Sequence, residues 1–132
     1  MPQRHFLPLK RAAMTSVALM LAASAVAASP ALRLKGEPYG QARARLLKLG
    51  FEPVRFARTP DFDPCRYADD CDRYPEVLSC SGTGVAVCQF AFFDRHQRRY
   101  ILITTYGEEK RRVESVTPAS PRERAFWPRQ VR

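Results

Sequence analysis

The sequence predicts an α+β domain in which one helix packs on an antiparallel sheet of three or four strands, linked by disulfides. Three observations lead to this fold class: a helical apolar pattern, a strand-turn-strand pattern and four cysteines. The chain has 132 residues and therefore room for one domain. Because so small a domain buries a limited share of its surface, cross-links add usefully to its stability.

The clearest local pattern is a helix that ends near Gly50. Apolar residues recur at gaps of three and four, which places them on one face of a helix that packs on the sheet. These residues are Tyr39, Ala42, Leu46 and Leu49. Gly50 suits the left-handed position that follows many helix C-termini. Val54 and Phe56 then alternate with a polar residue, so a short strand is expected directly after the helix.

A β-hairpin is expected in the longest apolar segment of the remaining chain. The run Val85 to Phe93 is β-branched and aromatic, and the polar turn Asp94 to Arg98 separates it from a second such run, Tyr100 to Thr105. Arg112 to Val116 is expected to form a final strand. Tyr74 to Leu78, in the preceding long connection, is expected to add a helical turn.

The N-terminus has the order of a secretory signal peptide. Lys10 and Arg11 precede an apolar run over residues 12–27, and small residues follow, so cleavage is expected after Ala27 or Ala28. The alternative is a membrane anchor, but the run is shorter than the ~20 apolar residues that span a bilayer. We therefore expect a protein of the periplasm or the extracellular space, with no membrane span after cleavage.

The predicted organisation follows from that leader. Residues 1–27 are the signal peptide, residues 28–35 a linker and residues 36–116 the disulfide-stabilised domain. Residues 117–132 form a tail rich in proline and arginine, which is expected to be extended or disordered.

The four cysteines are expected to form two disulfides. Cys65, Cys71, Cys80 and Cys88 all follow the leader, and export ends in an oxidising compartment. Three pairings are open. Pairing Cys65 with Cys71 and Cys80 with Cys88 is favoured because short loops close easily. The alternative is a zinc site, but the gaps of five, eight and seven residues differ from the usual C-x2-4-C spacing.

The segment from Gly36 to Val54 contains Y-x-x-A-R-x-x-L-x-x-x-G-F-x-P-V, beginning at Tyr39. It resembles the helix-then-strand opening of small exported bacterial proteins of unknown function that also carry four cysteines, a resemblance that covers Gly36 to Val116. The same segment is distantly similar to the helix and following strand of PASTA domains, which are extracytoplasmic modules. PASTA domains ordinarily lack a cysteine-rich insert, so their binding of muropeptides is not carried over to any residue here.

The charge balance is strongly basic. The net charge of +9 falls to +6 when Arg4, Lys10 and Arg11 leave with the leader. Such a surface favours anionic partners such as cell-envelope polymers, although arginine-rich composition also gives ordinary solvated surfaces. Nucleic acid is not expected as a partner, because no recognised module accompanies the basic runs at residues 98–99 and 110–112.

No catalytic constellation is evident in the sequence. His96 is the one histidine outside the leader and lies in the predicted hairpin turn. A small hydrolase that uses His96 with the acidic loop is one alternative, but nucleophilic catalysis needs a base oriented by a third group. A solvated turn histidine is the simpler interpretation.

Five aspartates in the long connection offer oxygen ligands for a hard cation such as Ca²⁺. They are Asp61, Asp63, Asp69, Asp70 and Asp72. Their spacing does not match an EF-hand, and carboxylates in a surface loop are usually solvated. No cofactor is predicted.

The tail offers a candidate contact surface. Phe126 and Trp127 lie among Arg122, Arg124 and Arg129, which combines residue types that are enriched at interface hot spots. They could anchor a partner or touch a membrane surface. The alternative is that Trp127 folds back over the sheet.

Together these features favour a noncatalytic exported binding or accessory protein. Its expected partner is a cell-envelope or extracellular protein, or an anionic polymer. Inhibition of a secreted hydrolase is a second hypothesis, and a small hydrolase is a third.

Overall fold

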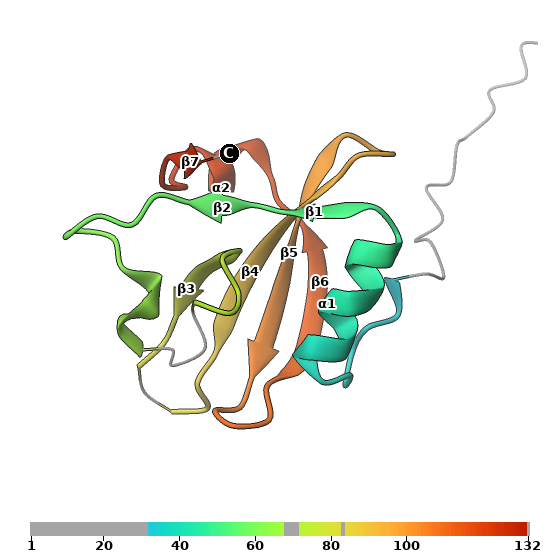
Figure 1. The fold of residues 1–132 in the computed structure, drawn as a ribbon, viewed down its shortest axis with the longest axis horizontal. Helices are drawn as coiled ribbons and strands as arrows, with labels where there is room; N and C mark the ends of the chain where they lie inside the picture. Colours follow the sequence, from blue (N-terminus) through green and yellow to red (C-terminus); the bar gives the residue numbers. More distant parts are fainter. Residues whose placement is uncertain (1–31, 68–71, 83, 132) are drawn as a thin grey trace, which may run out of the picture.

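The structure is a computed structural model that describes residues 32–67, 72–82 and 84–131. In these residues the named elements are α-helices, a 3-10 helix and β-strands (Figure 1). The helices are α1 (Tyr39–Lys48), η2 (Pro64–Tyr67) and α2 (Pro121–Arg124). The strands are β1 (Phe51–Pro53), β2 (Arg55–Phe56), β3 (Val77–Cys80), β4 (Cys88–Asp94), β5 (Arg99–Tyr106), β6 (Arg112–Pro118) and β7 (Gln130–Val131).

The α+β class with an antiparallel sheet is confirmed, but the main sheet has five strands rather than three or four. β5 and β6 follow β4 on one side, while β1 and β3 share its other edge. The additional strand is β3, which overlaps the segment Tyr74 to Leu78 that the sequence predicts as a helical turn. That expectation is wrong because Val77 and Leu78 are both buried and their strand pairs with β4.

The predicted hairpin is present as β4 and β5, paired from Cys88 opposite Thr105 to Asp94 opposite Arg99. The Asp94 carboxylate accepts hydrogen bonds from the backbone N–H groups of His96 and Gln97, which fixes the turn. The first strand begins at Cys88 rather than Val85. The residues before Cys88 do not join the strand, because Ala86 has a φ of 49°, which is incompatible with a strand.

Side chains alternate between the two faces of the sheet. We call the face under α1 the helix face, and its core includes Tyr39, Leu46, Phe90, Phe92 and Ile101. The opposite face, here the tail face, has a smaller core that consists of Val54, Phe56, Leu78, Ala91, Leu102 and Ala119. Consecutive residues of β4 thus serve different cores.

The start of α1 is joined to the edge of β6. Gly36 N–H donates to the Val113 carbonyl (2.7 Å), and Tyr39 N–H donates to the Arg111 carbonyl (2.8 Å). Leu34 is fully buried in the core of the helix face. The packed region therefore begins within the segment that was predicted to be a linker. Gly50 has a φ of 84°, as expected for the position after the helix.

The tail is folded between Pro118 and Val131, so the expectation of an extended or disordered tail is wrong there. Ser120 and Glu123 form a capping box that starts α2, and β7 pairs with β2. Trp127 packs edge-on against Phe56 and Tyr100, at centroid distances of 5.6 and 5.4 Å. The tail orders because these rings give it an apolar surface to cover, which is the alternative considered for Trp127.

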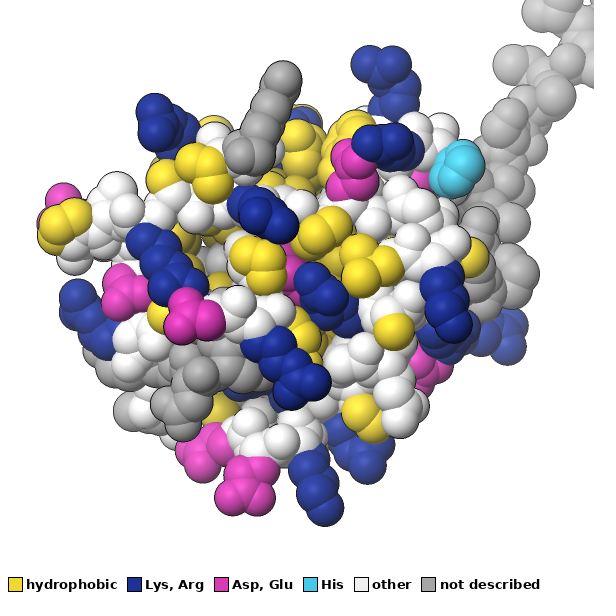
Figure 2. Space-filling view, in the orientation of Figure 1, with side chains coloured by type: hydrophobic (Ala, Val, Ile, Leu, Met, Phe, Trp, Pro, Cys, Tyr) yellow, Lys and Arg dark blue, Asp and Glu magenta, His cyan; other side chains and the backbone are white. Residues whose placement is uncertain are grey.

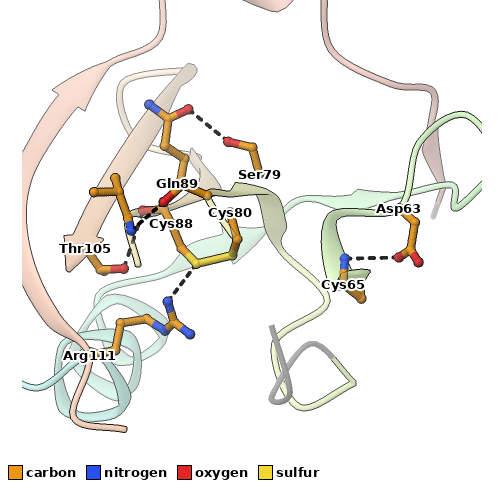
Figure 3. Close-up of a disulfide and its surroundings, with 10 residues drawn as sticks. Asp63, Cys65, Ser79, Cys80, Cys88, Gln89, Thr105 and Arg111 are labelled. Carbon is orange, nitrogen blue, oxygen red and sulfur yellow. Dashed lines mark hydrogen bonds between the residues drawn. A yellow bond between two sulfur atoms is a disulfide. The ribbon is translucent and has the colours of Figure 1, made fainter. Parts of the chain in front are cut away.

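The predicted disulfide between Cys80 and Cys88 is present and joins directly opposed residues of β3 and β4 (Figure 3). Cys65 is also in a disulfide, and its expected partner, Cys71, lies outside the described residues. The predicted leader, residues 1–27, lies outside them as well. Within the described part of the chain, no helix has the length and apolar character needed to cross a membrane.

Candidate functional site

A groove of about 820 Å³ is lined by the β3–β4 and β5–β6 connections, the start of α1 and the segment before β3. Figure 1 shows that the two connections and the start of α1 lie at the same end of the sheet. We call it the end groove. Its lining residues come from four separate stretches of the chain. They are Pro38, Tyr39, Gly40, Arg73, Tyr74, Ser81, Gly82, Ala86, Glu108, Glu109, Lys110, Arg111 and Arg112.

A buried polar network underlies this groove. The Tyr39 hydroxyl donates to Glu76 Oε1 (2.7 Å), and Arg43 donates through Nε to the same oxygen (2.6 Å) and through Nη2 to Oε2 (3.3 Å). Glu76 is fully buried, whereas the Arg43 side chain is 23% exposed. Because Glu76 immediately precedes β3, the network joins the long connection to α1. Its role here is structural, since no solvent reaches the carboxylate.

The electrostatics of the network follow from this burial. Burial raises the pKa of Tyr39 well above its usual value, and the negative charge of Glu76 raises it further. The hydrogen bond to Glu76 raises the pKa of Arg43. Tyr39 therefore remains a neutral donor and Arg43 a cation, so the Glu76 carboxylate keeps both partners.

Tyr74 forms the wall of the groove above the network. Its ring meets Tyr39 edge-on at 5.0 Å, and the guanidinium carbons of Arg43 and Arg73 lie 5.6 and 5.7 Å from its centroid. A Cβ placed on Gly40 would lie 3.4 Å from the Tyr74 hydroxyl oxygen. The absence of a side chain at Gly40 thus leaves room for this aromatic wall.

The Cys80–Cys88 disulfide supports the other side of the groove. Arg111 Nη1 donates to Cys88 Sγ, and the Arg111 guanidinium carbon lies 5.9 Å from the centroid of Phe90 (Figure 3). The loop closed by the disulfide is further fixed because Gly107 N–H donates to the Val85 carbonyl (2.8 Å). The β3–β4 and β5–β6 connections therefore hold each other in place.

The end groove has the chemistry of an anion-binding surface. Its lining contains four cations, Arg73, Lys110, Arg111 and Arg112, and two carboxylates, Glu108 and Glu109. Arg73 and Lys110 are exposed at its rim. Guanidinium groups present several donors to carboxylate or phosphate oxygens, and an ammonium acts as a compact charge. No histidine is among the described residues that line the groove.

The structure does not bring His96 to the acidic loop. His96 lies in the β4–β5 turn, with Nε2 3.6 Å from the position of a Cβ on Gly50, just past α1. Asp61 and Asp63 belong to the segment between β2 and η2, which lies on the opposite side of the molecule from the β4–β5 turn in Figure 1. The combination that the hydrolase hypothesis requires is therefore not assembled among these residues.

Three of the five candidate metal ligands, Asp61, Asp63 and Asp72, lie in the described part of the chain. Asp63 accepts a hydrogen bond from Cys65 N–H (3.0 Å), and Asp72 forms an ion pair with Arg58 (2.9 Å). Asp69 and Asp70 lie outside the described residues. Within the described ranges, no three His, Cys, Asp or Glu side chains form a group that could hold a metal ion.

The tail residues that were predicted to contact a partner lie together, away from the end groove. Phe126 is 83% exposed, whereas Trp127 is half-buried. Arg122, Arg124 and Arg129 are exposed around them. Figure 2 shows Lys and Arg side chains beside hydrophobic ones along its upper rim, the end at which α2 and β7 lie in Figure 1.

Sequence reasoning missed Glu76 and Tyr74 as the residues that organise the end groove. The available signal was a carboxylate immediately before an apolar pair, Val77 and Leu78, where a buried charge needs a partner. The groove cations at residues 110–112 were noted as a basic run. Nothing in the sequence indicated that residues 110–112 lie beside Arg73, because tertiary folding brings together two segments that are almost forty residues apart.

Comparison with protein-family models, with curated proteins and with solved structures found no match. The resemblance to small exported bacterial proteins and to PASTA domains therefore stays a prediction. The function proposed below is therefore inferred from the fold and the groove of this chain alone.

Proposed function

We infer that this chain is a noncatalytic exported binding protein that holds an anionic cell-envelope polymer in the end groove. The observation that carries the inference is the convergence of Arg73, Lys110, Arg111 and Arg112 beside an aromatic wall. Backbone hydrogen bonds join Arg111 to the start of α1 and the β5–β6 connection to the loop closed by the disulfide, so part of the lining is held before a ligand arrives and the entropic cost of binding is lower.

Export is part of this proposal. The disulfide is compatible with an oxidising compartment, and the basic-then-apolar order of residues 10–27 is that of a secretory leader. An anionic polymer of the envelope would meet the groove in that compartment. Long-range attraction by the basic surface would speed the encounter at low ionic strength.

A charge-reversal experiment tests the groove. Fluorescent polygalacturonate and polyphosphate serve as carboxylate and phosphate probes, and binding is followed by anisotropy at low and high salt. The double substitution Arg73→Glu and Lys110→Glu changes exposed rim residues only. We expect the affinity of the bound probe to fall about tenfold, the size expected for a few exposed charge contacts.

Lys48→Glu is the control, because Lys48 is exposed in the last turn of α1, at the end opposite Gly40. This variant should keep nearly all of the affinity. A loss per reversed charge that is as large in the control as in the double variant would mean that net charge alone drives binding, and the groove proposal would fail. Absence of binding to either probe would also contradict it.

A second candidate function is inhibition of a secreted hydrolase. The observation that favours it is Val85, which is 67% exposed in a loop closed by the Cys80–Cys88 disulfide and tied to Gly107. Because the backbone at Val85 is already held, it loses little entropy when this apolar residue enters an enzyme cleft.

Inhibition assays with a muramidase and a serine protease test this second candidate. Wild-type protein should slow one of these enzymes at a stoichiometric ratio, and Val85→Asp should abolish the effect without changing the fold. Full enzyme activity in the presence of excess wild-type protein would remove both enzyme classes from consideration.

A further inference from the structure

We propose that the end of the molecule opposite the end groove docks on an anionic phospholipid bilayer. We call this surface the basic end, and it consists of the β4–β5 turn, β1, β2 and the segment 121–131, which contains α2 and β7. Seven arginines lie on it, against three acidic residues. The arginines are Arg55, Arg95, Arg98, Arg99, Arg122, Arg124 and Arg129, and the acids are Glu52, Asp94 and Glu123.

The acids offset only part of this charge at the surface, because they are fewer than the arginines. Asp94 is buried and accepts backbone hydrogen bonds in the turn. Glu52 pairs with Arg95, and Glu123 caps α2 through Ser120. Six of the seven arginines are exposed, all but Arg99. Juxtaposed guanidinium groups of this kind attract the phosphates of anionic headgroups.

An exposed aromatic ring accompanies the arginines. Phe126 is 83% exposed and borders a shallow apolar groove of about 370 Å³. The groove is also lined by Phe62, Leu78, Leu102, Trp127 and Pro128, together with Ser79, Gln89 and Glu123. Asp61 and Asp63 flank Phe62, so the positive charge is concentrated over α2 and β7.

The ring is presented from a rigid base. A capping box fixes α2, and Trp127 packs edge-on against Phe56 and Tyr100. The guanidinium of Arg124 lies over the Tyr100 ring, with its carbon 5.0 Å from the centroid. Phe126 therefore has a fixed position relative to the arginines, and its insertion costs little ordering.

Charge complementarity favours a bilayer over a protein as the occupant. Arginine and aromatic residues are also enriched at protein interfaces, but the cores of those interfaces contain several packed apolar groups. Here, exposed arginines surround one protruding ring, which is the composition of interfacial anchors that combine a basic polar surface with aromatic insertion.

The topology gives the docked molecule an orientation. The β4–β5 turn and the β5–β6 turn lie at opposite ends of β5 (Figure 1). Docking through the first turn directs the second, and with it the end groove, away from the bilayer. Lipid docking and groove binding are thus independent and can occur together.

Vesicle sedimentation with the mature chain tests the proposal. One set of vesicles is phosphatidylcholine, and the other is the same lipid with one-third phosphatidylglycerol. We expect binding to the anionic set alone and its loss at high salt. Phe126→Ser should weaken binding about tenfold, and the double substitution Arg122→Glu and Arg129→Glu should abolish it.

The single tryptophan provides a second readout. Trp127 adjoins Phe126, so brominated acyl chains should quench its fluorescence in anionic vesicles. Quenching should disappear in the Phe126→Ser variant bound at saturation, because the ring no longer carries its neighbour to the acyl chains. Undiminished quenching in that variant would contradict insertion.

The groove variant Arg73→Glu with Lys110→Glu is the matched control, with the same number of reversed charges at the other end. It should keep its affinity for vesicles, and the Arg122→Glu with Arg129→Glu variant should keep its affinity for the groove probes. Equal binding to neutral and anionic vesicles would overturn the proposal. So would binding of glycerol phosphate at the basic end without any binding to vesicles.

Discussion

The two faces of the sheet are covered by different elements and bury different amounts of apolar surface. Among the described residues, the core of the helix face has twelve buried residues and that of the tail face has six, so the helix face carries most of the apolar burial there. It also contains the buried Glu76 network and the Cys80–Cys88 disulfide. The tail face is covered by half-buried rings, among them Phe62, Tyr100 and Trp127.

This difference indicates that the helix face provides most of the stability and that the tail face mainly presents exposed side chains. The helix face positions the end groove because its network and disulfide reach directly under the lining. The tail face holds a short folded segment that leaves Phe126 and several arginines exposed. We therefore expect substitutions on the helix face to unfold the protein and substitutions on the tail face mainly to alter its surface.

The largest predicted effect comes from Glu76→Leu on the helix face. Removing the carboxylate leaves the buried Tyr39 hydroxyl and the partly buried Arg43 without their partner. The free energy of unfolding, measured by urea titration, should fall by about 3 to 5 kcal/mol. Glu76→Gln is the control, because its amide oxygen can still accept from Tyr39, and it should cost less. An equal loss in both variants would show that the negative charge of Glu76, rather than its shape or its acceptor oxygen, stabilises the network.

Breaking the Cys80–Cys88 disulfide should come next. The paired substitution Cys80→Ser and Cys88→Ser removes the cross-link between β3 and β4 and should lower the free energy of unfolding by about 2 to 4 kcal/mol. Thermal unfolding with and without reductant checks this result. A reductant effect that is as large in the paired variant as in wild type would assign the stabilisation to the disulfide of Cys65 instead.

Trp127→Ala should have a smaller effect, about 2 kcal/mol, because the ring is only half-buried and makes two edge contacts. Amide hydrogen exchange should show loss of protection at β7 with β4 and β5 unchanged. Loss of protection across the whole sheet would contradict the division between the faces, because it would mean that the tail is part of one cooperative core.

The local patterns predicted the helix face well. Apolar spacing located α1, β-branched and aromatic runs located β4 and β5, and Gly50 marked the end of the helix. These features depend on neighbours within a few residues, so the sequence alone contains their cause. The pairing of Cys80 with Cys88 followed from a similar local argument about loop closure.

The tail face was predicted poorly because its cause is not local. Pro118, Pro121 and Pro128 suggested an extended tail, yet Trp127 finds its partners at Phe56 and Tyr100, far away in the sequence. The end groove was missed for the same reason. Arg73 meets residues 110–112 only after β3, β4 and β5 have formed.

A high-pH titration sharpens the comparison on the helix face. The raised pKa of Tyr39 means that the folded protein keeps its phenol proton when the unfolded chain, with a value near 10.0, loses it. The unfolded state then binds fewer protons, so stability falls as pH rises above about 10. The difference in free energy of unfolding between wild type and Tyr39→Phe should therefore shrink in alkaline solution. A constant difference would contradict the assigned cause.

A low-pH titration is the matching test on the tail face and should give the smallest effect. Hydrogen bonds from Ser120, first from its backbone N–H, lower the pKa of Glu123 below its usual 4.5. The ionised Glu123 cap contributes to the free energy of unfolding above pH 4.5. This contribution is lost as the pH falls through the lowered pKa, because the carboxylate of the folded state then takes up a proton. Trp127 fluorescence should report loosening of α2 in acid, while far-UV circular dichroism of the sheet stays constant.

Glu123→Ala removes the titrating group and should make the Trp127 signal insensitive to pH in this range. Since Glu123 is fully exposed, solvent screens the interaction, and the change should remain confined to the tail. If acid instead loosened β4 and β5 together with Trp127, the cap would be coupled to the helix face. The tail would then have to be regarded as an integral layer of the fold, and Phe126 would lose its independent base for contact with a bilayer.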